Sequence, residues 1–469
     1  MTFDLRGVDV NFHVLLLVGY SAVLLALGLA VSRRVKSASG FFVADRRLSA
    51  VFVFATVLAA NIGAGSTVGA TGLGYRSGFS AWWWNGSAAI GSVLLAVWIA
   101  PRVWRQASRF GFLTTGDLLE HHFGARVRGL VAGMLWLATL SILAGQLIGI
   151  AWILNVVAGL PKWAGCLIGG GLMTAYFTAG GLLSSAWVNL VQLGVLLAGF
   201  GITVPMAVAR VGGLDALAGA ARASGQAMFW DGATSVSFLV LLVPSFMISP
   251  GLLQKAFGGA SERAVRRGIA WNAVVLFAFA CVPALLGLAA RVNHAGLAQE
   301  LALPTLLASD LPVGLGSILL AAIFSAEVST ADAVLFMLST SLSQDLYRRF
   351  MNPAASDSQV LRVARLAAVA GGTLGILIAL VTPTIVGALS VFYAMLGATL
   401  FVPVLVALHA RVDRRAEVTV SIVAGAAAVA TVQFGVGVRH GSLVTPATVG
   451  LLTAACAYGA AVAWRSVRR

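Results

Sequence analysis

Charged side chains are scarce in this sequence. Only 10% of its 469 residues are Asp, Glu, Lys or Arg, and its mean hydropathy is +0.94. Soluble globular domains carry about 25% charged residues, so the composition excludes an ordinary soluble protein. Apolar stretches that are long enough to cross a bilayer as helices recur along the whole chain. The sequence therefore indicates a polytopic membrane protein.

Cysteines and catalytic signatures are scarce as well. The three cysteines, Cys166, Cys281 and Cys456, fall in apolar stretches without metal-ligand spacing, so we expect no disulfide framework. The run GAGSTVG at 63–69 is not a phosphate-binding loop, because it lies inside an apolar stretch and no Lys follows it. No nucleophile–base pair is evident, and we expect neither an enzyme nor an organic cofactor.

The apolar stretches predict the fold class. We expect an all-α polytopic membrane protein with about 13 transmembrane helices in a single domain that covers residues 1–469. The expected spans are 14–32, 50–73, 79–101, 129–157, 162–179, 184–208, 234–254, 269–290, 314–342, 363–382, 385–408, 418–437 and 446–464.

The net charge of +15 reflects membrane topology. With the N-terminus outside, 24 of the 31 Lys and Arg residues fall in cytoplasmic segments and seven fall outside. This bias predicts an inner-membrane protein with a cytoplasmic C-terminus. The basic segments then face anionic lipid headgroups, and no nucleic-acid partner is expected. Lys255 is counted among the cytoplasmic residues, so no Lys or Arg is expected to line a cavity.

Two spans are interrupted at membrane depth. The second contains Gly63 and Gly65 in LAANIGAGSTVG, and the seventh contains Ser249-Pro250-Gly251. Gly weakens a helix and Pro removes a backbone donor, and broken backbone in a membrane must line a cavity or be buried in protein. The breaks are five spans apart, which predicts an inverted 5+5 repeat. The repeats would be 50–208 and 234–408, with an extra helix at 14–32 and two more within 418–464.

The ninth span, near 314–342, concentrates oxygen-bearing side chains. Glu327 and Asp332 are the two acidic residues that we expect inside a span. A carboxylate at that depth costs a few kcal/mol, so it should face the protein interior, a water-filled cavity or a cation. Ser325, Ser329 and Asp332 share one helix face. The segment therefore predicts part of an ion site.

Four stretches resemble motifs of the sodium:solute symporter family. They are FFVADRRLS, YFTAGGLLSSAWVNLVQ, LLQKAFGGASERAVRRG and AAIFSAEVSTADAVLFMLSTSLSQDLY. Their order and spacing cover nearly the whole chain. The resemblance implies the leucine-transporter fold with flanking helices, alternating access, and sodium-coupled symport of a small organic solute.

The resemblance also implies a sodium site between the second and ninth spans. Its ligands would be the backbone carbonyls of Ala59, Ile62 and Ala326 and the hydroxyls of Ser329 and Thr330. This set is chemically reasonable, because a hard cation prefers oxygen ligands. The break near Gly63 would also free the preceding carbonyls from their helical donors.

A second cation site has two alternatives in this sequence. Some members of the family carry an Asp in the sixth span, and the matching residue here is Asn189. Asp332 stands where some relatives place a hydroxyl ligand. We therefore expect either a modified second site made by Asn189 and Asp332, or the loss of that site. Glu327 lies far around the helix from Ser329, and structural, gating and proton-coupling roles remain open for it.

The solute is expected to bind beside the two broken helices, near the membrane midplane. The candidate polar contacts are Ser66, Thr67, Asn85, Gln146, Ser249 and Tyr393. Each could equally be an ordinary interhelical hydrogen-bonding residue. Two other functions remain alternatives: a proton-coupled symporter that uses Glu327 or Asp332, and a transporter-derived sensor.

Overall fold

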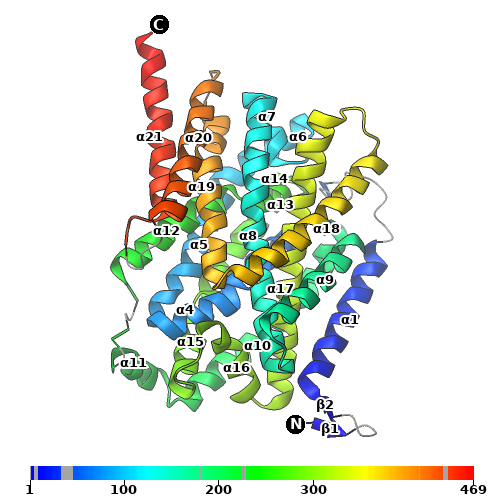
Figure 1. Cartoon of the computed structure of the whole chain (residues 1–469), viewed down its shortest axis with the longest axis vertical. Coiled ribbons are helices and arrows are strands. Elements are labelled where there is room, and N and C mark those ends of the chain that lie inside the picture. The colour runs from blue at the N-terminus through cyan, green and yellow to red at the C-terminus, as the bar shows by residue number, and fades with distance from the viewer. Residues whose placement is uncertain are drawn as a thin grey trace.

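A computed structural model describes residues 2–4, 9–32, 46–179, 182–223, 225–226, 229–410, 412–436 and 442–468. Within these residues almost all of the chain is helical, and the helices form one elongated bundle (Figure 1). A short antiparallel hairpin of β1 (Thr2–Asp4) and β2 (Asp9–Asn11) lies at the N-terminal end. The two termini lie at opposite ends of the bundle (Figure 1).

Ten helical stretches in the described part of the chain are long and apolar enough to cross a membrane. They confirm the all-α polytopic class, whereas the number thirteen stays a prediction. The long single helices are α1 (Phe12–Ser32), α8 (Ala125–Ala158), α9 (Lys162–Ala179), α10 (Leu182–Arg210), α17 (Val313–Thr340), α18 (Asp357–Val381), α19 (Ile385–His409) and α21 (Pro446–Val467).

Several membrane helices change type or continue into a second element. These pairs and series are η3 (Gly78–Ala81), α5 (Trp82–Leu94), η4 (Leu95–Ile99) and α6 (Ala100–Phe110); α14 (Glu262–Phe279) and α15 (Cys281–Asn293); η6 (Ser341–Met351) after α17; and α20 (Arg415–Ala430) with η7 (Thr431–Val436). The connecting segments add α7 (Thr115–Phe123), α11 (Leu214–Ala223), η5 (Gln299–Leu301) and α16 (Ala302–Ser309).

The second span is broken where the glycines predict it. α3 (Ala50–Asn61) ends before Ile62, and the chain resumes in the π-helix η2 (Gly65–Gly69) and in α4 (Ala70–Ser77). A Cβ atom on Gly63 would lie 2.6 Å from the Thr330 hydroxyl oxygen. Glycine at this position thus permits both the break and the close approach of α17.

The seventh span is broken at Ser249. α12 (Gly232–Ile248) ends there because Ser249 has a non-helical backbone, with φ −54° and ψ 123°, and α13 (Pro250–Phe257) begins with Pro at its first position. Pro is favoured at that position because its missing N–H would have no helical partner. α17 packs against α3, α8, α10 and α13, so it lies beside both breaks and positions the site.

Candidate sodium and solute site

Thr330 of α17 faces the broken end of α3. Its hydroxyl oxygen lies 3.0 Å from the carbonyl oxygen of Ala59, 3.3 Å from that of Ile62 and 2.9 Å from that of Ala326. A hydroxyl has one proton to donate, so three carbonyl acceptors converge on a single donor. This surplus of oxygen acceptors makes the position chemically suited to a cation.

The break explains why two of these carbonyls are available. In an unbroken helix the N–H of Gly63 would donate to Ala59, and the N–H of Ser66 would donate to Ile62. Here the Gly63 N–H donates to the Ser66 hydroxyl at 3.0 Å, and the Ser66 N–H donates to the Gly63 carbonyl at 3.0 Å. Local rearrangement of the backbone therefore leaves the carbonyls of Ala59 and Ile62 directed at α17.

Ser329 lies on the neighbouring face of α17, against α10. Its hydroxyl donates to the side-chain oxygen of Asn189 at 2.5 Å. One turn earlier, the Gln192 amide donates to the Ser325 hydroxyl at 2.5 Å. The structure thus joins Asn189 to the predicted ligand set through Ser329.

Asp332 interacts electrostatically with Lys255 of α13. Lys255 is only 7% exposed and lines the cavity beside the second break, together with Thr330, Ser249 and Tyr393. The expectation that no basic residue lines the cavity was therefore wrong. Lys255 closely follows the apolar run of the seventh span. Its position in the sequence is therefore typical of a residue at the cytoplasmic end of a span as well as of one that lines a cavity.

Glu327 is fully buried one turn before Thr330. Neither of its carboxylate oxygens has a hydrogen-bond donor among the described residues. Thr67 of η2 is a polar neighbour of this carboxyl group, but its hydroxyl donates to the Gly63 carbonyl at 2.8 Å. A Cβ atom on Gly149 of α8 would lie 2.7 Å from one of the carboxylate oxygens. Glycine in α8 therefore makes room for this carboxyl group.

The solute candidates fall around two adjoining cavities that share Thr330 and Tyr393. Ser66, Asn85 and Gln146 line the first, and Ser249 lines the second. Two of these side chains also hold the first break in place. Gln146 accepts a hydrogen bond from the Ala64 N–H at 2.9 Å, and Asn85 donates to the Ser66 carbonyl at 3.0 Å.

The walls of these cavities are largely aromatic and aliphatic. Tyr393 of α19 packs edge-on against Trp84 of α5, with ring centroids 6.3 Å apart, and its ring is tilted against that of Phe246 of α12, with centroids 5.6 Å apart. Thr67, also a solute candidate, is not among the residues that line either cavity. Its hydroxyl instead supports the break through Gly63.

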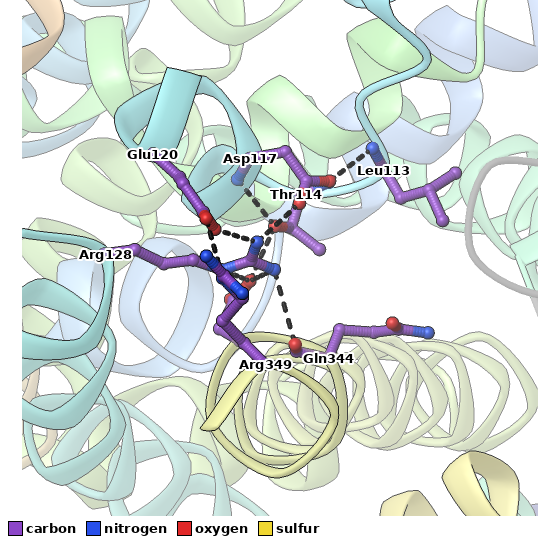
Figure 2. A network of polar contacts seen from close by, with 8 residues as sticks. Leu113, Thr114, Asp117, Glu120, Arg128, Gln344 and Arg349 are labelled. Carbon is purple, nitrogen blue, oxygen red and sulfur yellow. Dashed lines mark hydrogen bonds and ion pairs between the residues drawn. The ribbon is translucent and has the colours of Figure 1, made fainter. Parts of the chain in front are cut away.

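A polar cluster lies at the end of the bundle that carries α7 (Figures 1 and 2). Arg128 of α8 reaches Asp117 at 2.9 Å, Glu120 at 2.8 Å and Asp345 of η6 at 2.6 Å. Arg349 binds the second oxygen of Glu120 at 2.6 Å. Partial burial alone would raise the pKa of the Glu120 carboxyl, but the two guanidinium groups outweigh it and lower that pKa.

The cluster connects with the central cavity. Arg128 and Asp345 line a further cavity, which shares Met337 and Phe392 with the cavity that Lys255 lines. The described residues therefore form a series of cavities from the first break to the α7 end of the bundle. Arg128 and Asp345 are 217 positions apart in the chain, and no short motif pointed to their pairing.

Two discontinuous helices around a central cavity define a secondary transporter of the leucine-transporter fold. A substrate-bound, outward-open Na⁺-coupled sialic acid symporter has this fold, with a TM-score of 0.78 and 20% identity over 96% of this chain and 98% of that one. The profile of the sodium:solute symporter family matches residues 41–423. The chain therefore belongs to the sodium:solute symporter family and is a sodium-coupled solute symporter.

Alignments with relatives that are similar in sequence cover most of the chain. The chain is 25% identical over 410 residues to the sodium/glucose cotransporter of Vibrio parahaemolyticus, a match that covers 77% of this chain and 73% of that protein. It is 27% identical over 399 residues to the sodium/pantothenate symporter of Escherichia coli K12, with 78% of each chain covered. These relatives differ in the solutes that their names give, so they leave the solute of this chain open.

Proposed function

We propose that the coupling sodium ion binds at the first break and that the solute binds in the adjoining cavities. The sodium ligands are the carbonyls of Ala59, Ile62 and Ala326 and the hydroxyls of Ser329 and Thr330. The observation that carries this proposal is the convergence of three carbonyls on the Thr330 hydroxyl. Ser329 would have to change its side-chain rotamer, turning from Asn189 toward the ion.

Coupling follows from where the ligands lie. Ala59 and Ile62 belong to the broken second span, whereas Ala326, Ser329 and Thr330 belong to α17. An ion held by both elements stabilises the conformation in which they are in contact, and a ligand shifts the equilibrium only through such differential binding. Thr330 also lines the solute cavity, so the same conformation shapes the solute site.

The solute contacts in this proposal are Ser66, Asn85, Gln146, Ser249 and Tyr393, with Thr67 supporting the break. The chain forms one transporter domain over 1–469, with repeats at 50–208 and 234–408 flanked by 14–32 and by the helices of 418–464. The protein resides in the inner membrane with its N-terminus outside and its C-terminus cytoplasmic. The charge bias of the loops supports this orientation, as does the location of the termini at opposite ends of the bundle (Figure 1).

A modified second cation site at Asn189 and Asp332 extends the proposal. Its support is the short hydrogen bond between Ser329 and Asn189, which brings an amide oxygen to the sodium ligands. Replacing Asp332 by Asn should then lower the Hill slope of sodium dependence. An unchanged slope and unchanged transport would show that Asp332 is not a ligand.

The experiment that tests the proposed function uses purified protein in liposomes. A screen of solute classes by thermal shift, with and without sodium, first finds a solute that stabilises the protein only when sodium is present. Uptake of that solute is then measured with inward sodium and with choline in its place at constant pH. Sodium-driven accumulation is expected, and accumulation that follows only a proton gradient would contradict it.

A further inference from the structure

Lys255 is a buried cation beside the solute path. It comes from the last turn of α13, and its side chain runs back along that helix, because the ammonium group donates to the Gly251 carbonyl at 3.3 Å. An ammonium group has three donors, and this contact uses one of them. This hydrogen bond holds the ammonium group close to the second break, where Lys255 lines the cavity.

The surroundings of Lys255 do not satisfy its charge by direct contact. Among the described residues no carboxylate forms an ion pair with its ammonium group within 4.0 Å, although Asp332 interacts with it electrostatically at longer range. Among the residues that line the two solute cavities, Lys255 is the one charged side chain in the described part of the chain. A buried cation normally requires a hydrogen-bonded partner of opposite charge.

The shape and polarity of the cavity indicate what such a partner would be. The N-terminus of α13, at Ser249 and Pro250, has no side-chain cap and opens on the same cavity. Helix N-termini favour anions. The remaining wall is mainly apolar, with Phe246, Phe392 and Val334, and it also carries the polar side chains of Asn61, Thr330 and Tyr393. An anionic group at Lys255, attached to a compact organic body, matches this arrangement.

We propose that the solute is a small organic anion whose carboxylate binds Lys255 at the start of α13. The inference rests on the proposed sodium-coupled function and names the substrate class of that site. Charge balance links this substrate class to sodium coupling. Lys255 and Asp332 together carry no net charge, and a sodium ion at Thr330 would add one positive charge next to the cavity. The solute carboxylate neutralises that charge, so each ligand strengthens the binding of the other.

The test is a thermal-shift and uptake series with small carboxylates, each paired with its neutral primary amide, and with iodide as an inorganic anion. In the presence of sodium ions, the wild-type protein should be stabilised by one or more carboxylates, but not by their amides or by iodide. Equal stabilisation by acid and amide, or stabilisation by iodide alone, would overturn the proposal.

Variants of Lys255 locate the interaction. Lys255→Met should weaken carboxylate binding roughly 10- to 100-fold, while Lys255→Arg should retain most of it. Lys162→Met is the matched control, because Lys162 lies outside the solute cavities and donates to the Thr382 carbonyl. Wild-type affinity in Lys255→Met would contradict the proposal. If Lys255→Met fails to fold, the acid–amide comparison in wild type still decides.

The failure of this inference can be told apart from failure of the proposed function. Carboxylate binding that is indifferent to sodium would contradict the sodium site and leave the anion subsite standing. Sodium-dependent binding that is indifferent to solute charge would contradict the anion subsite alone.

Discussion

The hydroxyl oxygen of Thr330 lies 3.0 Å from the carbonyl oxygen of Ala59. This contact joins α17 to the end of α3 across 271 positions of the chain, at the point where the second span is broken. It depends on the absence of a side chain at Gly63 and on the diversion of the Gly63 N–H to Ser66.

Substitution of Gly63 by Ala should weaken sodium binding and stability together. The new Cβ would lie 2.6 Å from the Thr330 hydroxyl oxygen and 2.7 Å from the Gln146 side-chain oxygen. Overpacking of this kind costs about 1–3 kcal/mol, which thermal unfolding with and without sodium would detect. Gly133→Ala is the control, because nothing lies within 4 Å of its added Cβ. Equal behaviour of the two variants would contradict the close packing at Gly63.

Loss of the Arg128 guanidinium should strongly destabilise the α7 end of the bundle. Arg128→Met leaves Asp117 and Asp345 without their ion-pair partner. Removing one member of a buried ion pair typically costs about 3–5 kcal/mol. Arg126→Met, at an exposed position on the same helix, should leave the melting temperature nearly unchanged. A small, equal effect of both variants would show that the cluster adds little stability.

The ion pairs of Glu120 should make stability fall in acid. Its pKa in the folded protein lies below the ordinary value of 4.5, chiefly because Arg128 and Arg349 outweigh the opposing effect of burial. The stabilisation is therefore complete above about pH 4.5 and is lost as the pH falls through the lower, folded-state pKa. Thermal unfolding of wild type and Glu120→Gln should differ most at neutral pH and converge in acid. A difference in thermal stability between the two proteins that grows in acid would contradict this prediction.

Replacement of Glu327 by Gln should preserve folding and sodium-driven transport. The carboxylate oxygens have no hydrogen-bond donor among the described residues, so the isosteric amide loses no such contact. Glu327→Ala should be less stable, because it leaves a cavity against η2 and α8. Thermal unfolding and uptake assays compare the two variants. Loss of transport in Glu327→Gln with normal folding would favour the proton-coupling role instead.

Local backbone chemistry made much of the fold predictable. Gly63 and Gly65, and Ser249-Pro250, act on the helices in which they lie, so both breaks could be placed from the sequence. The oxygen-rich face of α17 could also be predicted from the sequence, because helical periodicity decides which residues share a face. These features depend on neighbours within a few positions.

Features that depend on distant segments could not be predicted in the same way. Arg128 pairs with Asp345 across 217 positions, and nothing near either residue signals the other. Lys255 was assigned to a cytoplasmic segment because the sequence does not show that its side chain runs back along α13 toward Gly251. The hydrogen bond from Ser329 to Asn189 likewise depends on how α10 packs against α17.

A sodium titration of thermal stability tests the central claim most directly. It compares wild type, Thr330→Ala and Thr399→Ala, a control in which the lost hydroxyl binds only its own helix, at the Met395 carbonyl. Loss of one ligand should raise the sodium concentration at half-maximal stabilisation roughly 10- to 100-fold in Thr330→Ala, and Thr399→Ala should titrate like wild type. A Thr330→Ala protein that titrates like wild type would contradict the sodium site proposed between α3 and α17.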